Sequence, residues 1–542
     1  MSRSVSALYA EVGLRGLPKI LGLLDRNRLS PTYGCFDKAY WHYRTAAFPS
    51  GMAQEFVLPL ALVYRYRFPG GEGYVGQPRL REWVLAGIHY AARSAHRDGS
   101  CDDYFPYERA LGAAAFSLYA CSESALLLEL RDATLEAFFR RRGQWLIRHG
   151  ESGLLANHHA LVVLALYNVY LYTRDAAFRH AARARLQQLL GWQSAEGWFP
   201  EYEGCDPGYT TATIDFLAKY YRKSGDAQVL APLRRAVQFV ADFMHPDGSF
   251  AGEYGSRNTY LFFPHGFELL APQVPEALWL AERYVQGLRR GLRVFLEDDR
   301  LIGHLTYNHL QAALDCWPQR QGGLAPAPGC RHWPEAGLYV YRRDSLYAVV
   351  SLAKGGVCKI FVNDRLLYGD SGLIARQRNG RCLVSHLIDR YESTLAEDSV
   401  TVGGYFGYVR YRLPSLPAVL AFYAFMATVG RLGRNAVRRV LQRLLIVGKR
   451  RAPLRFRRTL RFAPHVTLCD EVWDLRPRRQ GRRQLVDLYA GTDHTSIYVA
   501  MSNAYHPACL LPWHDYGAQL PQLWQTGYLR VCRTLYPERV QP

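Results

Sequence analysis

The feature that most restricts the fold of this chain is a series of segments in which apolar residues recur with the period of an α-helix. The series runs from about Phe56 to Val285, and turns rich in Gly, Pro and Asp separate its members. Helices joined by loops of alternating length predict stacked helical hairpins that curve into an (α/α) toroid, with the long aromatic loops lining a cleft at its open end. The predicted helices are 56–66, 80–95, 108–122, 133–149, 157–173, 175–190, 209–224 and 227–244.

The pattern changes after Trp317. Residues 318–335 are rich in Gly, Pro and Ala and predict a linker. Beyond it come short β-branched and aromatic runs bounded by Gly, Asp and Asn, which are typical of an antiparallel β-sandwich. These runs lie at 337–350, 356–368 and 399–411. Because 542 residues exceed the size of a single core, we expect an α+β multidomain protein, with the active site in a toroid at 1–317 and a β-sandwich at 336–542.

One segment near 414–450 interrupts the β pattern. Residues 416–429 are almost all apolar, a row of arginines follows them, and no acidic residue lies between Asp398 and Asp470. The apolar part is shorter than the about 20 residues that span a bilayer, so we exclude a transmembrane helix. Two interpretations stay open: residues 414–461 lie on an anionic membrane surface, or they pack on the sandwich with their arginines solvated or facing a polyanionic substrate.

The charge of the whole chain limits its partners. It has 67 Lys and Arg against 47 Asp and Glu, a formal net charge of +20, which favours an acidic glycan, a nucleic acid or an anionic lipid surface. We predict no nucleic-acid partner, because no recognised binding module accompanies the charge. An acidic polysaccharide or oligosaccharide is therefore the expected partner, and an anionic membrane surface is the alternative.

The cysteines and the N-terminal segment bear on the compartment. The 11 cysteines are scattered without CxxC pairs, which predicts reduced thiols rather than a disulfide or zinc framework. Residues 1–28 lack the uninterrupted apolar run and the cleavage site of a signal peptide. These features predict a cytoplasmic protein, or one held peripherally at the inner membrane, with no cofactor and no metal.

The most informative motif lies at 151–159. Here Asn157, His158 and His159 stand directly before an apolar helix, beside a loop rather than in the core. Asparagine is a favoured N-cap residue, but capping does not explain two histidines at the same helix start. The motif therefore indicates a functional site.

A second loop, 197–210, also ends at a predicted helix start. Trp198, Glu201 and Tyr202 crowd this loop, where sugar rings could stack and form hydrogen bonds, and Tyr209 follows at the helix. The alternative interpretation is a rigid Pro/Gly turn with buried aromatic side chains.

A third segment, 252–268, combines Gly, Arg, Asn and aromatic residues. It contains Arg257, Asn258 and His265, and suits a loop that presents a guanidinium to a carboxylate. A structural salt bridge explains Arg257 equally well. Tyr104, which follows the Asp-Gly turn near residue 98, is a weaker candidate for substrate contact.

Together these motifs resemble the heparinase II/III family of polysaccharide lyases, which is related to oligoalginate lyases and uronyl C5-epimerases. The resemblance rests on the Asn157-His158 pair, the Gly-Trp-Phe-Pro-Glu-Tyr-Glu loop that starts at Gly197, Tyr209, and the change to a β-domain. It implies an acidic glycan held between a toroid and a β-sandwich. It also implies that Asn157 and His158 neutralise the uronate carboxylate and that Tyr209 is the catalytic acid or base. A β-domain histidine usually completes such sites, and the candidates are His386 and His494.

The chemistry of a uronate supports these residue types. Removing its C5 proton builds negative charge on the carboxyl group, so donors such as Asn157, a protonated histidine or Arg257 stabilise the transition state. A tyrosine titrates near ~10, so Tyr209 needs cationic neighbours to act as the base. Proton donation to O4 of the leaving sugar completes a β-elimination. We predict a lyase of this kind, linked to bacterial exopolysaccharide metabolism.

Three other functions stay open. A uronyl C5-epimerase shares the proton abstraction and returns a proton to the opposite face. A hydrolase needs two carboxylates beside the scissile bond, but it leaves the histidines without a role. The acids near the motifs are Glu201, Glu203, Asp206 and Asp215. A non-catalytic glycan-binding or assembly factor fits the basic insertion.

Overall fold

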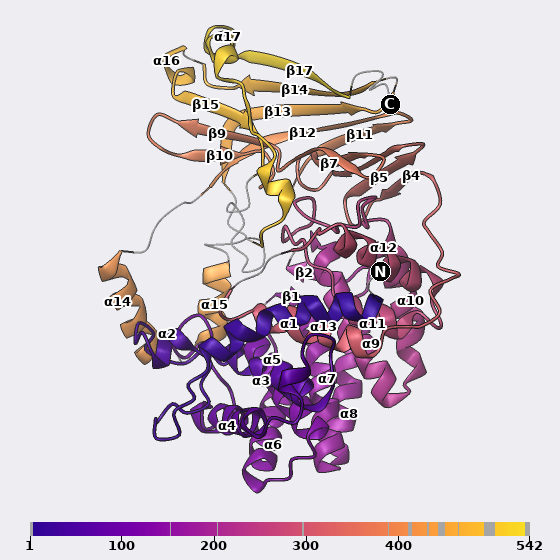
Figure 1. Cartoon of the computed structure of the whole chain (residues 1–542). Coiled ribbons are helices and arrows are strands. Elements are labelled where there is room, and N and C mark those ends of the chain that lie inside the picture. Colours follow the sequence, from indigo (N-terminus) through magenta and orange to yellow (C-terminus); the bar gives the residue numbers. More distant parts are fainter. Residues whose placement is uncertain are drawn as a thin grey trace.

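The computed structural model describes residues 4–151, 153–202, 204–294, 298–388, 390–409, 415–430, 433–442, 450–463, 465–477, 479–492 and 504–536. In these residues the chain forms three layers (Figure 1). A five-stranded antiparallel sheet packs on a helical domain, and a nine-stranded antiparallel sheet packs on the outer face of the first sheet. This arrangement confirms the predicted fold class, an (α/α) toroid followed by an antiparallel β-sandwich.

The eight predicted helices are all present, with ends that agree to within about five residues. The periodicity does not identify α1 (Val5–Leu23), the short helix at Lys38–Trp41, or the last three helices of the domain, which lie between Pro264 and Leu314. Helix α1 packs along α13 (Ile302–Leu314), and the Ser6 hydroxyl donates to the Ala313 carbonyl oxygen at 2.8 Å. The first and last helices of the domain are thereby joined. The others are α2 (Lys38–Trp41), α3 (Val57–Arg65), α4 (Pro78–Ser94), α5 (Leu111–Leu127), α6 (Ala133–Arg148), α7 (Ala156–Thr173), α8 (Ala176–Leu190), α9 (Pro207–Ser224), α10 (Leu230–Ala241), α11 (Pro264–Leu270) and α12 (Pro275–Arg289).

Aspartates define where several of these helices begin. Asp132, Asp175 and Asp206 precede α6, α8 and α9, and each carboxylate accepts a hydrogen bond from a backbone N–H in the first turn. Such caps contribute about 1 kcal/mol each. Pro207 occupies the first position of α9, and Gly225 ends that helix with a φ of 65°. Strong local signals of this kind explain why the sequence locates these helices well.

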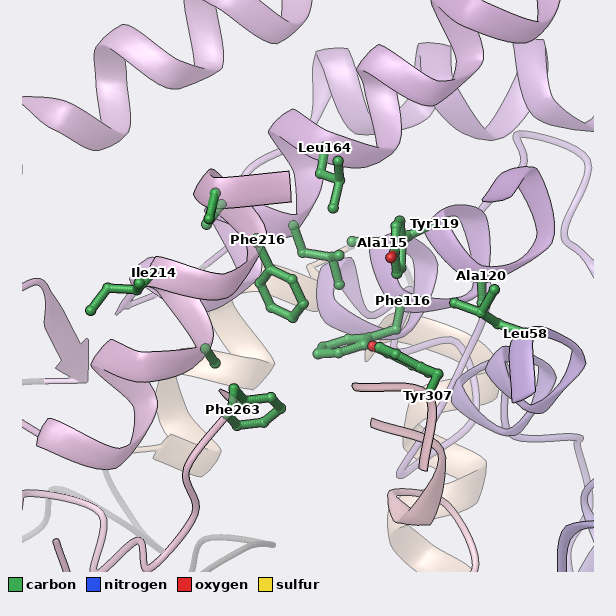
Figure 2. Packing of buried hydrophobic residues seen from close by; sticks show 14 of the residues in the cluster. Leu58, Ala115, Phe116, Tyr119, Ala120, Leu164, Ile214, Phe216, Phe263 and Tyr307 are labelled. Atoms are coloured by element: carbon green, nitrogen blue, oxygen red, sulfur yellow. The ribbon is translucent and has the colours of Figure 1, made fainter. Parts of the chain in front are cut away.

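Aromatic side chains fill the centre of the helical domain (Figure 2). The ring of Phe116 on α5 lies 5.9 Å from that of Phe216 on α9 and stacks at 4.1 Å on His304 of α13. One turn further along α5, the rings of Tyr119 and Tyr307 are 5.9 Å apart. Aromatic pairs contribute about 0.5–1.5 kcal/mol beyond the burial of apolar area. They fix the relative positions of α5, α9 and α13.

The five-stranded sheet joins the helical domain to the rest of the protein. Along β5 (Leu338–Arg343), Leu338 and Val340 belong to the hydrophobic core of the helices, whereas Tyr339 and Tyr341 face the second sheet. The two domains therefore share one core. The strands follow one another in space as β4 (Gly329–Trp333), β5, β6 (Leu346–Ser351), β7 (Val357–Val362) and β8 (Arg365–Asp370).

The second sheet has the order β16-β15-β9-β10-β12-β13-β14-β17, with β11 also paired to β12. Val400, Val402, Leu460 and Leu468 pack on the first sheet. The other end of the sheet forms a separate core with α17 (Leu520–Thr526). The strands are β9 (Leu373–Gln377), β10 (Cys382–Val384), β11 (Glu392–Ala396), β12 (Ser399–Tyr408), β13 (Arg451–Arg461), β14 (Val466–Asp474), β15 (Leu485–Ala490), β16 (His514–Asp515) and β17 (Tyr528–Tyr536).

The prediction that all cysteines are reduced thiols is wrong. Cys469 and Cys532 lie opposite each other on the neighbouring strands β14 and β17 and form a disulfide. They are 63 residues apart in the sequence, and only the register of the two strands brings them together. No local spacing could reveal the pair.

The segment predicted as an apolar and basic insertion leaves the second sheet between β12 and β13. Its described residues form α14 (Leu416–Phe425), a π-helical turn at Met426–Gly430, and α15 (Arg434–Gln442). The basic run does not continue as a helix after residue 450, because β13 is a strand inside the sheet. In the part of the chain that the structure describes, no helix has the length and apolar character needed to cross a membrane.

Candidate active site

A small three-stranded sheet brings the starts of α7 and α9 together. β1 (Leu154–Leu155) leads into α7, β2 (Pro200–Tyr202) pairs with it, and β3 (Gly204–Cys205) leads into α9. The register places Leu155 opposite Glu201. As a result, the first turns of two helices, which carry Asn157 and Tyr209, each meet a carboxylate near this sheet, Glu201 for α7 and Asp206 for α9. Helix N-termini carry partial positive charge, so this arrangement favours an anionic group nearby.

Glu201 is the carboxylate at the centre of this arrangement, and its side chain is fully buried. One of its oxygens accepts hydrogen bonds from the Asn157 backbone N–H at 2.9 Å and the Asn157 side-chain amide at 2.7 Å. The other oxygen accepts from the Arg257 guanidinium at 3.0 Å. Burial raises the pKa of Glu201, and Arg257 opposes this shift. Glu201 thus caps α7 and fixes two side-chain donors beside each other.

Asp206 holds the second half of the site. Its carboxylate accepts hydrogen bonds from the backbone N–H of Tyr209 and from that of Arg257, both at 2.9 Å. One acid therefore caps α9 and fixes the loop that carries Arg257. The close approach of this loop depends on Gly255, since a Cβ there would lie 2.7 Å from an Asp206 carboxylate oxygen.

Tyr209 and Arg257 are in direct contact. The guanidinium carbon lies 3.7 Å from the centroid of the Tyr209 ring and 4.8 Å from that of Tyr202, a cation–π arrangement with both rings. Burial raises the pKa of Tyr209, and the positive charge of Arg257 reverses only part of that shift. Tyr209 is therefore a protonated phenol at neutral pH.

His158 is oriented from two sides. Its Nδ1 lies 2.7 Å from a carboxylate oxygen of Glu151, and in the neutral tautomer whose Nδ1–H donates to this carboxylate, Nε2 carries the lone pair. On the other side its ring lies against Gly112 of α5, where a Cβ would come within 2.6 Å of the imidazole Cε1. The side chain of His158 is 17% exposed, so the ring is held in place but remains accessible to solvent.

Tyr104 approaches this group from the loop before α5. Its ring lies 5.4 Å from the guanidinium of Arg300, its hydroxyl is within electrostatic range of Tyr209, and 47% of the residue is exposed. An exposed aromatic ring beside a half-buried guanidinium and a buried phenol is suited to contact a sugar. The structure thus brings together Asn157, His158, Glu201, Tyr202, Tyr209, Arg257 and Tyr104.

Other predicted site residues lie apart from this group. The ring of His159 is buried against Trp192, with centroids 4.6 Å apart, because adjacent helix positions point about 100° apart. His265 is buried inside the helical domain with Nε2 2.8 Å from Asp315. Trp198 donates from its indole N–H to Glu196 at 3.0 Å.

Asn258 and the two β-domain histidines complete the comparison with the prediction. The side-chain oxygen of Asn258 accepts from Lys354 at 2.5 Å, so Asn258 anchors its loop. His386 is buried after β10, next to Ser385, whose carbonyl oxygen packs against Gly355. His494 lies outside the described residues.

Two lysines that the sequence analysis does not single out attach the Arg257 loop to the β-domain. Lys354, in the turn after β6, donates to the Gly255 carbonyl oxygen at 2.8 Å. Lys359 on β7 lies 3.0 Å from the carboxylate of Glu253 and 4.2 Å from the centroid of the Tyr260 ring. A lysine inside the apolar run of β7 is a signal of a buried partner. Its partner could not be inferred, because it comes from the other domain.

Comparison with known proteins adds to this geometry. No family model and no curated protein matches the sequence. The chondroitin AC lyase of Streptomyces coelicolor A3, solved in complex with chondroitin sulphate, is similar in structure with a TM-score of 0.53 and 13% identity, over 90% of this chain and 68% of that one. Paenibacillus xanthan lyase gives a TM-score of 0.53 and 10% identity, over 90% of this chain and 46% of that one.

In the described part of the chain, no group of three or more His, Cys, Asp or Glu side chains is placed to hold an ion. At the identities found, similarity concerns the fold alone. The chain has the fold of polysaccharide lyases that combine a helical toroid with a β-sandwich, which confirms the predicted resemblance at the level of the fold.

Proposed function

We propose that this protein is a polysaccharide lyase that cleaves a uronate-containing acidic glycan by β-elimination, in bacterial exopolysaccharide metabolism. The observation that carries the proposal is the group in which Asn157 and Arg257 share Glu201 and in which Arg257 contacts the Tyr209 ring. The fold shared with chondroitin and xanthan lyases supports it.

The charge around this group supports an acidic substrate. The N-termini of α7 and α9 converge here, and Arg257 and Arg300 lie on either side of Tyr209 and Tyr104. The Nε of Arg257 is a buried donor with no hydrogen-bond partner among the described residues. A uronate carboxylate would satisfy such a donor, whereas an apolar group placed against it would leave the donor unpaired.

In the proposed first step, Nε2 of His158 takes the C5 proton. Glu151 orients the imidazole and stabilises the imidazolium that forms. The electrons of the C–H bond move toward the carboxyl group, where negative charge builds. The Asn157 amide and the Arg257 guanidinium, both held by Glu201, stabilise that charge without reorganisation.

In the second step the C4–O4 bond breaks, the electron pair at C5 forms the C4=C5 double bond, and Tyr209 donates its proton to O4. Tyr209 starts as a phenol, because burial raises its pKa, and so it holds the proton that this step needs. Of the two roles that the resemblance implies for Tyr209, we therefore assign it the acid.

The carboxylates disfavour a hydrolase. Glu201 and Asp206 are fully buried and committed to hydrogen bonds with the Asn157 and Arg257 groups and with the backbone of α9. A hydrolase needs two carboxylates free to act on the bond and on water. A C5-epimerase would use the same His158 and Tyr209 but keep the C4–O4 bond.

The compartment also belongs to the proposal. Cytoplasmic placement stays a prediction, and the Cys469–Cys532 disulfide argues against a reducing compartment.

Proton NMR of a panel of uronate-containing glycans in heavy water tests the proposal. We expect a vinylic H4 signal with the unaltered protein and a loss of about 10³-fold in its rate with Tyr209→Phe. Tyr43→Phe, which removes the hydroxyl of a tyrosine that is 62% exposed, is the matched control and should keep full activity. Deuterium at C5 without cleavage would establish the epimerase instead, and the absence of both signals on all substrates would refute the proposal.

A further inference from the structure

Helix α14 is an apolar helix on the surface of the protein. None of its residues is buried, and Leu416 and Leu420 are 71% and 60% exposed. Phe425 at its end is 45% exposed, and Val429 in the following turn is 65% exposed. A helix that is apolar around its whole circumference is normally buried, and soluble proteins rarely expose such a surface without a partner.

The segment between β12 and β13, which carries α14 and α15, is longer than the connection of these two strands requires. β12 and β13 are paired neighbours, with Gly407 opposite Arg451, and a short hairpin would join them. Instead, Figure 1 shows α14 and α15 away from the strands, on the side of the helical domain. There the ring of Phe422 meets that of Phe105 at 5.5 Å. Phe105 adjoins Tyr104, so α14 is seated beside the candidate active site.

In the sequence, basic residues follow the apolar residues of α14. They are Arg431, Arg434, Arg438, Arg439, Arg443 and Lys449, and no acidic residue lies between Asp398 and Asp470. Arg439 and Val440 are exposed. Within β13, Arg458 is buried between Asp370 and Asp470, at 2.7 Å from each, and Arg455 and Arg457 pair with Glu392 and Glu471. These three arginines therefore have acidic partners inside the sheet.

We propose that α14, the turn Met426–Gly430 and α15 dock on an anionic phospholipid surface, with α14 lying in the interface. An apolar helix next to a cationic one is the combination that binds such a surface, through buried apolar area and attraction to lipid phosphates. A second copy of the chain fits less well, since a two-fold contact through α14 would bring the arginines of both α15 helices together. The docking places Tyr104 near the bilayer, which, on the proposed function, suits a glycan held at a membrane.

Co-sedimentation of the full chain with vesicles tests the docking. We expect binding to vesicles of phosphatidylcholine mixed with phosphatidylglycerol at least ~10-fold stronger than to phosphatidylcholine alone, and weaker binding as salt is raised. The variant Leu420→Asp with Phe425→Asp should bind the mixed vesicles ~10²-fold more weakly. Leu29→Asp, at a residue 93% exposed on the helical domain, is the matched control and should bind like the unaltered chain.

Two results would overturn the docking. One is that the double variant and the unaltered chain sediment equally well with the mixed vesicles, or that neither protein sediments with them. The other is a dimer in analytical ultracentrifugation that the double variant abolishes while vesicles capture neither protein, which would make α14 a contact between copies. Vesicle binding is measured without substrate, and lyase activity on a soluble glycan should be the same in the double variant. Failure of the docking is thus distinguishable from failure of the proposed function.

Discussion

Helices α7 and α14 have the same sequence signature and opposite surroundings. Both are apolar around their whole circumference. In α7 almost every side chain is buried against α5, α8 and α9, and Leu164 lies in the core shown in Figure 2. In α14 no side chain is buried. The apolar pattern alone therefore predicts removal from water, but it does not say whether the protein itself or something else provides the cover.

The residues beside each helix make the distinction. α7 begins with Asn157 and His158, which lie at the site, and its sides meet four other helices, α5, α6, α8 and α9. α14 is followed by a run of arginines without any acid. A core helix with polar groups at one end indicates a site built on a rigid element, and an exposed apolar helix with a cationic border indicates a docking surface.

The largest expected effect comes from placing a charge in each helix. Leu164→Asp should lower the free energy of unfolding by more than about 4 kcal/mol or prevent folding, because it buries an unpaired carboxylate. Leu420→Asp should change it by less than about 0.5 kcal/mol, since the side chain is 60% exposed. Urea unfolding followed by circular dichroism measures both. Similar losses in the two variants would mean that α14 is part of the folded core.

The second effect concerns the polar end of α7. His158→Ala should lower kcat by about 10² to 10⁴-fold on the glycan identified by NMR, because it removes the proposed base. Absorbance of the unsaturated product measures the rate, and thermal unfolding should show an unchanged Tm. A loss below tenfold would exclude His158 as the base and return that role to Tyr209.

The third effect tests how the position of the His158 ring matters, by changing a neighbouring residue and not the histidine itself. A methyl group at Gly112 would lie 2.6 Å from the imidazole Cε1, so Gly112→Ala should turn the ring away from Glu151. Displacement of a catalytic group by about 1 Å can cost 10²-fold in kcat. The clash should also lower the free energy of unfolding, by about 1–3 kcal/mol, which exceeds the gain of up to about 1 kcal/mol from replacing a helical glycine by alanine. Full activity in this variant would show that the ring position does not matter for catalysis.

Sequence patterns predict the parts of this molecule that are determined locally. Periodicity and caps locate α7 and α9, and the motifs at their starts contain Asn157 and Tyr209, which the structure brings to one site. The contacts that bring these residues together are between segments far apart in the sequence. Glu201 is placed beside Asn157 by the register of β1 and β2, and Lys354 of the β-domain holds the loop that carries Arg257.

The same limit explains the predictions that fail. The disulfide of Cys469 and Cys532 depends on the register of β14 and β17. His159 is inseparable from His158 in the sequence, yet a rotation of one helix position turns its ring to Trp192. Composition identifies residues suited to chemistry, and the position around a helix decides which of them reach the site.

The smallest effect separates these two histidines. Burial lowers the pKa of His159 to about 4, and neither ring nitrogen has a hydrogen-bond partner among the described residues. The unfolded chain therefore binds a proton that the folded chain rejects, and His159 lowers stability as pH falls from about 6.5 towards 4. His159→Phe should remove this penalty. When the pH is lowered from 7 to 5, the free energy of unfolding measured in urea should therefore fall by about 1–2 kcal/mol less in the variant than in the unaltered chain. Its kcat should stay unchanged, whereas a large fall in kcat would place His159 at the site and weaken the distinction between the buried sides of α7 and its catalytic end.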